Sequence, residues 1–110
     1  MKATPEGNVK RVLISYLRSL PNTFYYSAAA GPYSTTGIPD IVGCCGGKFF
    51  AIEVKAPGRR GQANRGASGM QVQQMSKIAA SGGFTMIFDG GDDDWEKLKA
   101  EVCDGSMFRV

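Results

Sequence analysis

One segment, residues 38–55, constrains the fold more than any other part of the chain. Its sequence is IPDIVGCCGGKFFAIEVK, in which two apolar runs flank a Gly-Gly pair. This pattern predicts two antiparallel strands, near 38–45 and 48–55, joined by a tight turn at Gly46 and Gly47. A hairpin determines which side chains share a face of the sheet, and therefore where the polar residues within it meet.

The register of this hairpin brings three charged side chains together. A two-residue or four-residue loop pairs Cys45 with Lys48. The same register places Asp40 directly opposite Glu53, with Cβ atoms about 4.5–5.5 Å apart, and Lys55 projects from the same face. Facing carboxylates in an apolar sheet repel each other unless a cation lies between them, which is typical of a site. A five-residue loop would instead put the two acids on opposite faces.

The composition limits the chemistry open to this group. The chain has no histidine, which excludes Ser-His-Asp and Cys-His catalysis and histidine-ligated metals. Its 3 cysteines lack a CxxC spacing and predict neither a disulfide framework nor a zinc site. Two carboxylates suit Mg²⁺ or Mn²⁺, and such an ion activates its bound water and offsets charge on a phosphate oxygen. Lys55 would then position or deprotonate the attacking water.

Two further polar side chains fall on the apolar faces of predicted helices. Glu6 lies at the start of a helix that Thr4 caps, that opens with Pro5 and that ends before Pro21. Gln71 lies near the start of a helix that Ser68 caps and Gly82 ends. Each also has a simpler explanation. An acid in a first helical turn complements the helix dipole, and a glutamine near a helix start is often only solvated.

The remaining segments complete an alternation of helices and strands. Residues 24–28 and 84–89 predict strands, 92–102 predict a final helix, and 107–110 suit an edge strand. The expected order is α-β-β-β-α-β-α-(β). Because a helix connects strand 48–55 to the next strand, this unit is βαβ and the sheet is expected to be mixed.

The length and charge of the chain indicate how many domains it forms and what kind of partner it binds. The 110 residues predict one domain, 1–110, and no apolar run or signal pattern indicates a membrane span, so we expect a cytoplasmic protein. The net charge of +3 is uneven, with basic residues at 1–20 and 48–65 and acidic residues at 89–104. Such a split suggests a polyanionic partner.

Two basic segments are candidates for contact with nucleic acid. Residues 57–69, PGRRGQANRGASG, have nothing to bury and predict a mobile, arginine-rich loop. A merely solvated loop is the alternative. The candidate phosphate contacts are Arg59, Arg60 and Arg65 in this loop and Lys10 and Arg11 in the first helix.

Several motifs follow one another in a specific order. They are Glu6 in the first helix, GIPD at 37–40, EVK at 53–55, and Gln71 about eleven residues before a Gly-Gly pair. With the predicted topology, this order resembles the VRR-Nuc branch of the PD-(D/E)XK nuclease superfamily over roughly residues 4–88.

That resemblance implies an α/β fold with a restriction-endonuclease-like core, a mixed β-sheet flanked by helices. It also implies an Mg²⁺- or Mn²⁺-dependent endodeoxyribonuclease without a nucleotide cofactor. By this resemblance Asp40 and Glu53 are metal ligands and Lys55 is the catalytic lysine. Glu6 is an additional acidic residue of the metal site, and Gln71 is an accessory residue.

The resemblance also suggests a substrate and a setting. Stand-alone members of this length occur in bacteriophages and bacteria, which implies a bacterial or phage-infected cell. Single-domain members look like Holliday-junction resolvases, which implies branched DNA as partner and a homodimer, because a four-way junction needs two cuts. Residues 107–110 or the aromatic residues Phe24, Tyr25 and Tyr26 are candidate interface material. A flap nuclease or a restriction-like nuclease is an alternative.

Two rival interpretations do not involve catalysis. A DNA-binding module of the same fold would bind without cutting, but it need not keep the complete Asp-Glu-Lys set. A structural protein could pair Asp40 with Lys55 in a buried salt bridge, but Glu53 would then lack a partner.

Overall fold

The computed structural model describes residues 4–28 and 35–102 of the chain. The elements are α1 (Pro5–Ser19), β1 (Thr23–Ser27), β2 (Ile41–Cys45), β3 (Lys48–Val54), the 3₁₀ turn η1 (Ala63–Gly66), α2 (Gly69–Ala80), β4 (Phe84–Phe88) and α3 (Asp92–Glu101). The predicted order of helices and strands is therefore confirmed up to residue 102. The edge strand expected at 107–110 lies outside the described residues.

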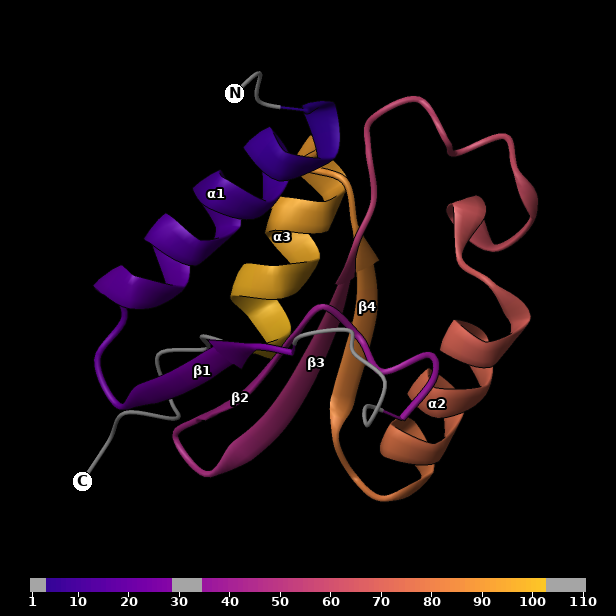
Figure 1. The fold of residues 1–110 in the computed structure, drawn as a ribbon. Helices are drawn as coiled ribbons and strands as arrows, with labels where there is room; N and C mark the ends of the chain where they lie inside the picture. Colours follow the sequence, from indigo (N-terminus) through magenta and orange to yellow (C-terminus); the bar gives the residue numbers. More distant parts are fainter. Residues whose placement is uncertain (1–3, 29–34, 103–110) are drawn as a thin grey trace.

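The four strands form one mixed sheet in the order β1-β2-β3-β4 (Figure 1). β1, β2 and β3 are antiparallel neighbours, and β4 runs parallel to β3, as the βαβ pattern predicts. Cys45 pairs with Lys48, which confirms the predicted hairpin register. Gly46 and Gly47 both have positive φ angles, of 57° and 89°, which a tight hairpin turn requires.

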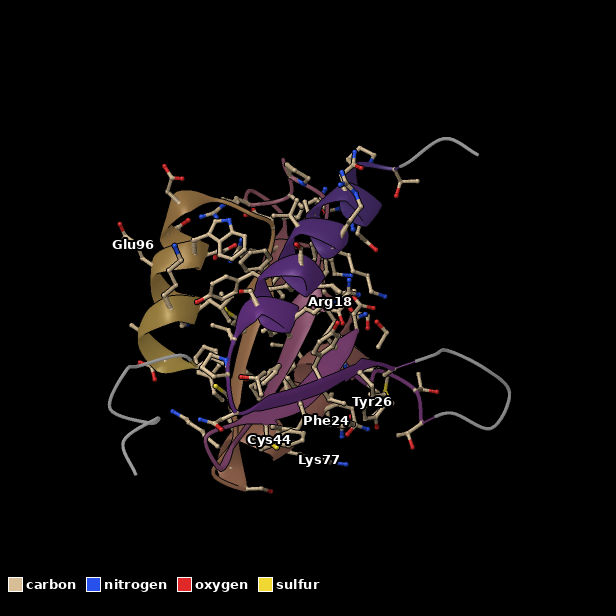
Figure 2. The ribbon with its side chains drawn as sticks, turned by 90° about the vertical axis from the view of Figure 1, so that its left-hand side faces the viewer. Arg18, Phe24, Tyr26, Cys44, Lys77 and Glu96 are labelled. Atoms are coloured by element: carbon tan, nitrogen blue, oxygen red, sulfur yellow. The ribbon has the colours of Figure 1, made fainter. Side chains whose placement is uncertain are left out.

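Helices cover the two faces of this sheet unequally. α1 and α3 lie side by side on one face, and α2 lies on the other, where it packs mainly against β4 and β3 (Figure 1). On the face of the sheet that carries α2, helices therefore cover β1 and β2 less than they cover β3 and β4. Figure 2 shows Phe24 and Tyr26 of β1 well apart from Glu96 of α3. The chain is a small α/β domain with a mixed sheet flanked by helices.

The hydrophobic core lies between the sheet and the α1–α3 layer. Alternate strand residues point into it, because successive side chains of a strand face opposite sides. Its buried members are Leu13, Leu17, Ile41, Cys45, Phe50, Ile52, Val54, Phe84, Met86, Phe88, Leu98 and Val102. Trp95 of α3 closes the core by edge-to-face contacts, with ring centroids 4.9 Å from Phe88 and 5.2 Å from Tyr16.

The first helix begins as its sequence predicts. The Thr4 side chain accepts a hydrogen bond from the Gly7 N–H at 2.9 Å, and Pro5 occupies the first helical turn. Across residues 4–28 and 35–102, none of the helices combines the length and the apolar character that a membrane span needs.

Candidate active site

The predicted site residues meet where β3 ends and β2 begins. Glu53 is the penultimate residue of β3 and is only 2 % exposed. Lys55 follows the strand, and its backbone N–H donates to the Phe88 carbonyl at 3.0 Å, which continues the ladder to β4. Asp40 directly precedes β2, which begins at Ile41 rather than at residue 38. The hairpin thus brings both acids and the lysine to one end of the sheet.

A backbone hydrogen bond holds the Asp40 carboxylate against the end of β3. Its Oδ2 accepts from the Val54 N–H at 2.9 Å. The Asp40 carbonyl also accepts from the Ala28 N–H at 2.8 Å, which ties the residue to the end of β1. These two contacts keep Asp40 close enough to Glu53 for its negative charge to act on that residue.

The two carboxylate oxygens of Glu53 have different surroundings. Oε2 accepts a hydrogen bond from Gln71 Nε2 at 2.8 Å and lies 3.2 Å from Lys55 Nζ. Oε1 is buried, and no group in the described part of the chain forms a hydrogen bond with it. The Lys55 ion pair forms with Glu53, so a salt bridge between Asp40 and Lys55 is not the pairing observed.

This environment disfavours the charged form of Glu53. Burial raises the pKa of Glu53 from 4.5 to about 7, and the negative charge of Asp40 contributes in the same direction. The hydrogen bond and the charge of Lys55 oppose these effects without cancelling them. The group of side chains therefore has less positive charge than its carboxylates require.

Gln71 connects α2 to this group through both ends of its amide. Oε1 accepts from the Ser68 N–H at 2.8 Å, and Ser68 Oγ accepts from the Gln71 N–H at 3.1 Å, so the two residues form a capping box. Because Nε2 is thereby directed at Glu53, the explanation of Gln71 as a merely solvated residue is wrong. The capping box that begins α2 therefore also orients the amide that donates a hydrogen bond to Glu53.

Gly37 shows how closely the segment before β2 approaches α2. Its φ angle is +84°, and a Cβ atom there would lie 2.5 Å from the Met70 carbonyl oxygen. A larger residue would push this segment, and Asp40 with it, away from the helix. The glycine of the GIPD motif is therefore required by packing.

Glu6 lies outside this group. It is exposed in the first turn of α1, and its charge is the smallest of the causes that raise the pKa of Glu53. Across residues 4–28 and 35–102, no three side chains of Asp, Glu, Cys or His are arranged to hold a metal ion. The structure thus brings together Asp40, Glu53, Lys55 and Gln71 and leaves Glu6 at their periphery.

The donor set nevertheless fits a hard divalent cation. Mg²⁺ is commonly held by one or two carboxylates, with water and phosphate oxygens completing its shell. The unpartnered Oε1 of Glu53 and the facing carboxylate of Asp40 are the two features that suit such an ion. A bound cation would also offset the repulsion that raises the pKa of Glu53.

Two of the predicted DNA-binding arginines are instead engaged by aspartates next to β4 and α3. We call Arg60, Arg65, Asp89, Asp93 and Asp94 the arginine–aspartate cluster. Arg60 donates to both carboxylate oxygens of Asp89 at 2.9 Å and to Asp93 at 2.6 and 2.8 Å. Arg65 donates to the buried carboxylate of Asp94 at 2.7 and 3.1 Å.

This cluster anchors the segment that the sequence predicts to be a mobile loop. Arg65 also donates to the Ile87 carbonyl at 3.1 Å, and Ala67 is buried. The expectation that the segment has nothing to bury is therefore wrong. The hydrogen bond from Arg60 holds the pKa of Asp89 well below its usual range. The aspartates are the partners that the sequence analysis missed, since nothing local links them to the arginines.

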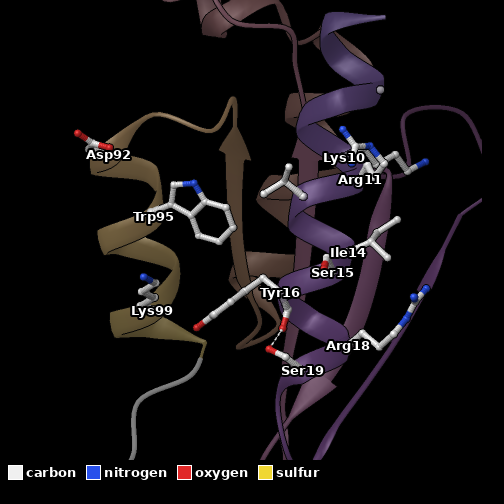
Figure 3. Close-up of a pocket in the computed structure, with 12 residues that line it drawn as sticks. Lys10, Arg11, Ile14, Ser15, Tyr16, Arg18, Ser19, Asp92, Trp95 and Lys99 are labelled. Atoms are coloured by element: carbon white, nitrogen blue, oxygen red, sulfur yellow. Dashed lines mark hydrogen bonds between the residues drawn. The ribbon is translucent and has the colours of Figure 1, made fainter. Parts of the chain in front are cut away.

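The other predicted cations lie in different surroundings. Arg59 is partly buried, and its guanidinium packs beside Gly66. Lys10, Arg11, Arg18 and Lys99 are among the residues that line a hollow of about 1070 Å³ over α1 and α3, which we call the basic groove. In Figure 3, Arg11 and Arg18 extend to the side of α1 away from α3. Of the acids, only Asp92 is among the residues described as lining this basic groove.

Comparison with protein-family models, with curated proteins and with solved structures gave no match to this chain. The functional conclusion therefore depends on the residues of the site and their geometry.

Proposed function

We propose that the protein is a metal-dependent endodeoxyribonuclease whose active site consists of Asp40, Glu53 and Lys55. The observation that carries this proposal is the surroundings of Glu53, a buried carboxylate with one unpartnered oxygen, a second carboxylate opposite and a lysine within 3.2 Å. Strongly perturbed acids with specific charged neighbours are characteristic of functional sites. The restriction-endonuclease-like core is part of this proposal.

Asp40 and Glu53 would hold Mg²⁺ or Mn²⁺. When bound, such an ion lowers the pKa of a coordinated water and stabilises negative charge on phosphate oxygens. The chain orients both ligands beforehand, because the Val54 N–H holds Asp40 and the Gln71 amide holds Glu53. This preorganisation reduces the rearrangement that a reaction would otherwise require.

Lys55 would act on the phosphate or on the attacking water. Its ammonium has three N–H donors, and the contact with Glu53 Oε2 at 3.2 Å uses one of them. The remaining donors would bind a phosphate oxygen or orient a water molecule. The side chain is 12 % exposed, which leaves a path to a substrate.

The basic groove would supply contacts to the DNA backbone. Lys10 and Arg11 keep the role that the sequence analysis expects for them, and Arg18 and Lys99 join them. Each neutralised phosphate makes binding more sensitive to salt. Arg60 and Arg65 contribute less to this interface, since their guanidinium groups are already paired with aspartates.

The substrate proposed is branched DNA, with a four-way junction cut by a homodimer. Each chain supplies one set of site residues, so two symmetric cuts need two chains. One observation favours a second candidate function, a DNA-binding module without catalysis. Glu6 does not join Asp40 and Glu53 in a three-carboxylate group within residues 4–28 and 35–102.

A cleavage assay separates these candidates. Labelled four-way junction, flap and linear duplex DNA are incubated with Mg²⁺ or Mn²⁺, and products are resolved on denaturing gels. We expect paired symmetric nicks on the junction that EDTA and Lys55→Ala both abolish. Lys48→Ala is the matched control, because Lys48 lies at the other end of β3 and pairs with the exposed Glu101. Tight DNA binding without cutting of any substrate would favour the non-catalytic module.

A further inference from the structure

Part of the sheet face that carries α2 exposes aromatic side chains. In β1, Phe24 is 66 % exposed and Tyr26 is 56 % exposed, and their ring centroids lie 6.5 Å apart. Tyr25 between them packs against the core on the opposite face. The strand therefore presents two of its three aromatic rings to solvent. Exposed aromatic residues gathered on one face often mark an interaction site.

The strand register extends this surface across the sheet. Phe24 pairs with Cys44 of β2, and Cys44 pairs with Phe49 of β3. Directly paired residues share a face, so Phe49, which is also exposed, belongs to the same surface. We call Phe24, Tyr26 and Phe49 the aromatic platform. Figure 2 labels Phe24, Tyr26 and Cys44 on these two neighbouring strands.

The aromatic platform and the candidate active site lie on one face of the sheet. Every second residue of a strand faces the same side of the sheet. Cys44 and Val42 of β2 therefore share a face with Asp40, which directly precedes the strand. Tyr26 pairs with Val42, next to Asp40 on that face. Cys44 lies four positions after Asp40, a distance of about 13 Å along an extended chain. A molecule bound on the platform would thus lie on the same face of the sheet as the two carboxylates, which are beyond the buried Val42.

The charges around the aromatic platform suit a polyanion. β1 and β2 contain no charged residue, and Lys77 is the only charged residue of α2. Lys77 and Phe49 line the same hollow of about 340 Å³. Phosphates would therefore meet a cation and no acid along these elements, apart from the proposed metal ligands at their end.

We propose that the aromatic platform binds single-stranded DNA by base stacking and directs the strand toward Asp40 and Glu53. This inference rests on the proposed nuclease function, but among branched DNAs it favours those with a single-stranded segment, such as a flap, over the fully paired four-way junction. Every base has a π-face, so stacking on Phe and Tyr tolerates any sequence. A sheet surface with exposed aromatic rings is a recurrent way of binding single strands.

A second copy of this chain fits the aromatic platform less well. A stable protein interface needs about 20–30 residues on each side, whereas three exposed rings and their neighbours form a much smaller surface. The lysine at its border is also a residue type that interface cores tend to exclude. Dimerisation through the aromatic platform is therefore the outcome that would oppose DNA binding there.

The test measures binding without cleavage. A fluorescent oligo-dT of about twelve nucleotides, within the usual site size, is titrated with protein in EDTA and followed by anisotropy. We expect Phe24→Ala and Tyr26→Ala each to weaken binding about tenfold, as loss of one stacked base predicts. Ser27→Ala is the control, because Ser27 is exposed on the same strand but faces the other side. Unchanged affinity in the Phe24 and Tyr26 variants would overturn the proposal.

A second measurement uses the unaltered protein and does not depend on variants that fold. An oligonucleotide with 5-iododeoxyuridine is photo-crosslinked, and the modified peptide is identified by mass spectrometry. Crosslinks at Phe24, Tyr26 or Phe49 support the proposal, and crosslinks confined to other segments overturn it. A wild-type dimer that Phe24→Ala makes monomeric, with unchanged oligo-dT binding, would assign the surface to a second copy instead.

Binding and cleavage measurements distinguish an error about the aromatic platform from an error about the nuclease activity. Binding in EDTA requires no cutting, so weaker binding by the Tyr26 variant stands even if no substrate is ever cleaved. Conversely, cleavage of duplex and flap DNA at equal rates by wild type and Tyr26→Ala would leave the nuclease intact and contradict the platform.

Discussion

Two groups of carboxylates, each with at least one buried member, lie near the carboxyl ends of the parallel strands β3 and β4, and they are neutralised to different degrees. In the arginine–aspartate cluster, guanidinium groups bind the carboxylates of Asp89 and Asp94. At the candidate active site, one lysine and one amide bind a single oxygen of Glu53. The pKa of Asp89 is accordingly lowered, whereas that of Glu53 is raised to about 7.

The two groups of side chains are suited to different roles. Paired arginines leave the cluster with little capacity for another ligand, and they attach the segment after β3 to the start of α3. The unpartnered oxygen of Glu53 leaves the candidate site short of positive charge. Removing one partner of the balanced cluster would leave a buried charge alone, which is costly, whereas the unbalanced charge of the candidate site suits the proposed metal ion.

The largest effect expected is on cleavage. Glu53→Gln should lower the rate by at least about 10³-fold, because the amide removes a proposed metal ligand while keeping the shape of the side chain. Asp93→Asn, in the other cluster, is the control and should retain most activity, since Asp93 is exposed and remote from the proposed chemistry. Gel assays under single-turnover conditions measure both rates. Equal losses in the two variants would remove the distinction between the clusters.

The next largest effect concerns stability. Asp94→Ala should lower the free energy of unfolding by about 3 kcal/mol, the cost of leaving one partner of a buried ion pair alone. The change removes the acceptor of the Asp89 N–H and the carboxylate that Arg65 binds in two places, and leaves Arg65 with Asp89 and the Ile87 carbonyl. Asp92→Ala, in the same helical turn but exposed, should change stability by less than about 0.5 kcal/mol. Urea denaturation provides the comparison, and similar midpoints for both variants would contradict it.

The two clusters should respond to pH in opposite directions. The pKa of Glu53 is raised, so the folded protein binds more protons than the unfolded chain between pH 4.5 and about 7. The stability that this group contributes is complete below pH 4.5 and is lost as the pH rises through 7, by about 3 kcal/mol. The lowered pKa of Asp89 gives the reverse, with stability present above pH 3.8 and lost as the pH falls.

Glu53→Gln isolates the first of these effects. Its unfolding free energy should stay nearly constant from pH 5 to 8 while that of the wild type falls, as urea titrations at each pH would show. A wild type whose stability instead rises over this interval, relative to the variant, would mean that Glu53 is satisfied as a charged group.

The smallest effect is expected at the helix that connects the two regions. Gln71→Ala should cost about 1–2 kcal/mol, because it removes half of a capping box and a hydrogen bond to a buried acid. Gln73→Ala on the exposed side of α2 should be nearly neutral. Thermal unfolding of the pair measures the difference, and equal melting temperatures would show that the Gln71 contact adds nothing to stability.

Much of the candidate site could be predicted because its geometry is local. A Gly-Gly turn determines the hairpin register, and the register alone places Asp40 across from Glu53 with Lys55 beside them. Glu6 shows the limit of this approach, since helical periodicity indicated an inward position but the side chain lies exposed at the edge of the site. Periodicity predicts which face of a helix is turned toward the core, whereas tertiary packing determines which residues of that face are buried.

The sequence by itself determined the order of the elements, the helix caps at Thr4 and Ser68, and the pairing within the hairpin. Each of these depends on hydrogen bonds between residues that are neighbours in the chain. Only the tertiary structure decided that Arg60 meets Asp89, 29 positions away, and that one oxygen of Glu53 is buried without a hydrogen-bond partner among residues 4–28 and 35–102. Charge pairing and desolvation depend on which distant segments pack together, and local sequence patterns do not contain that information.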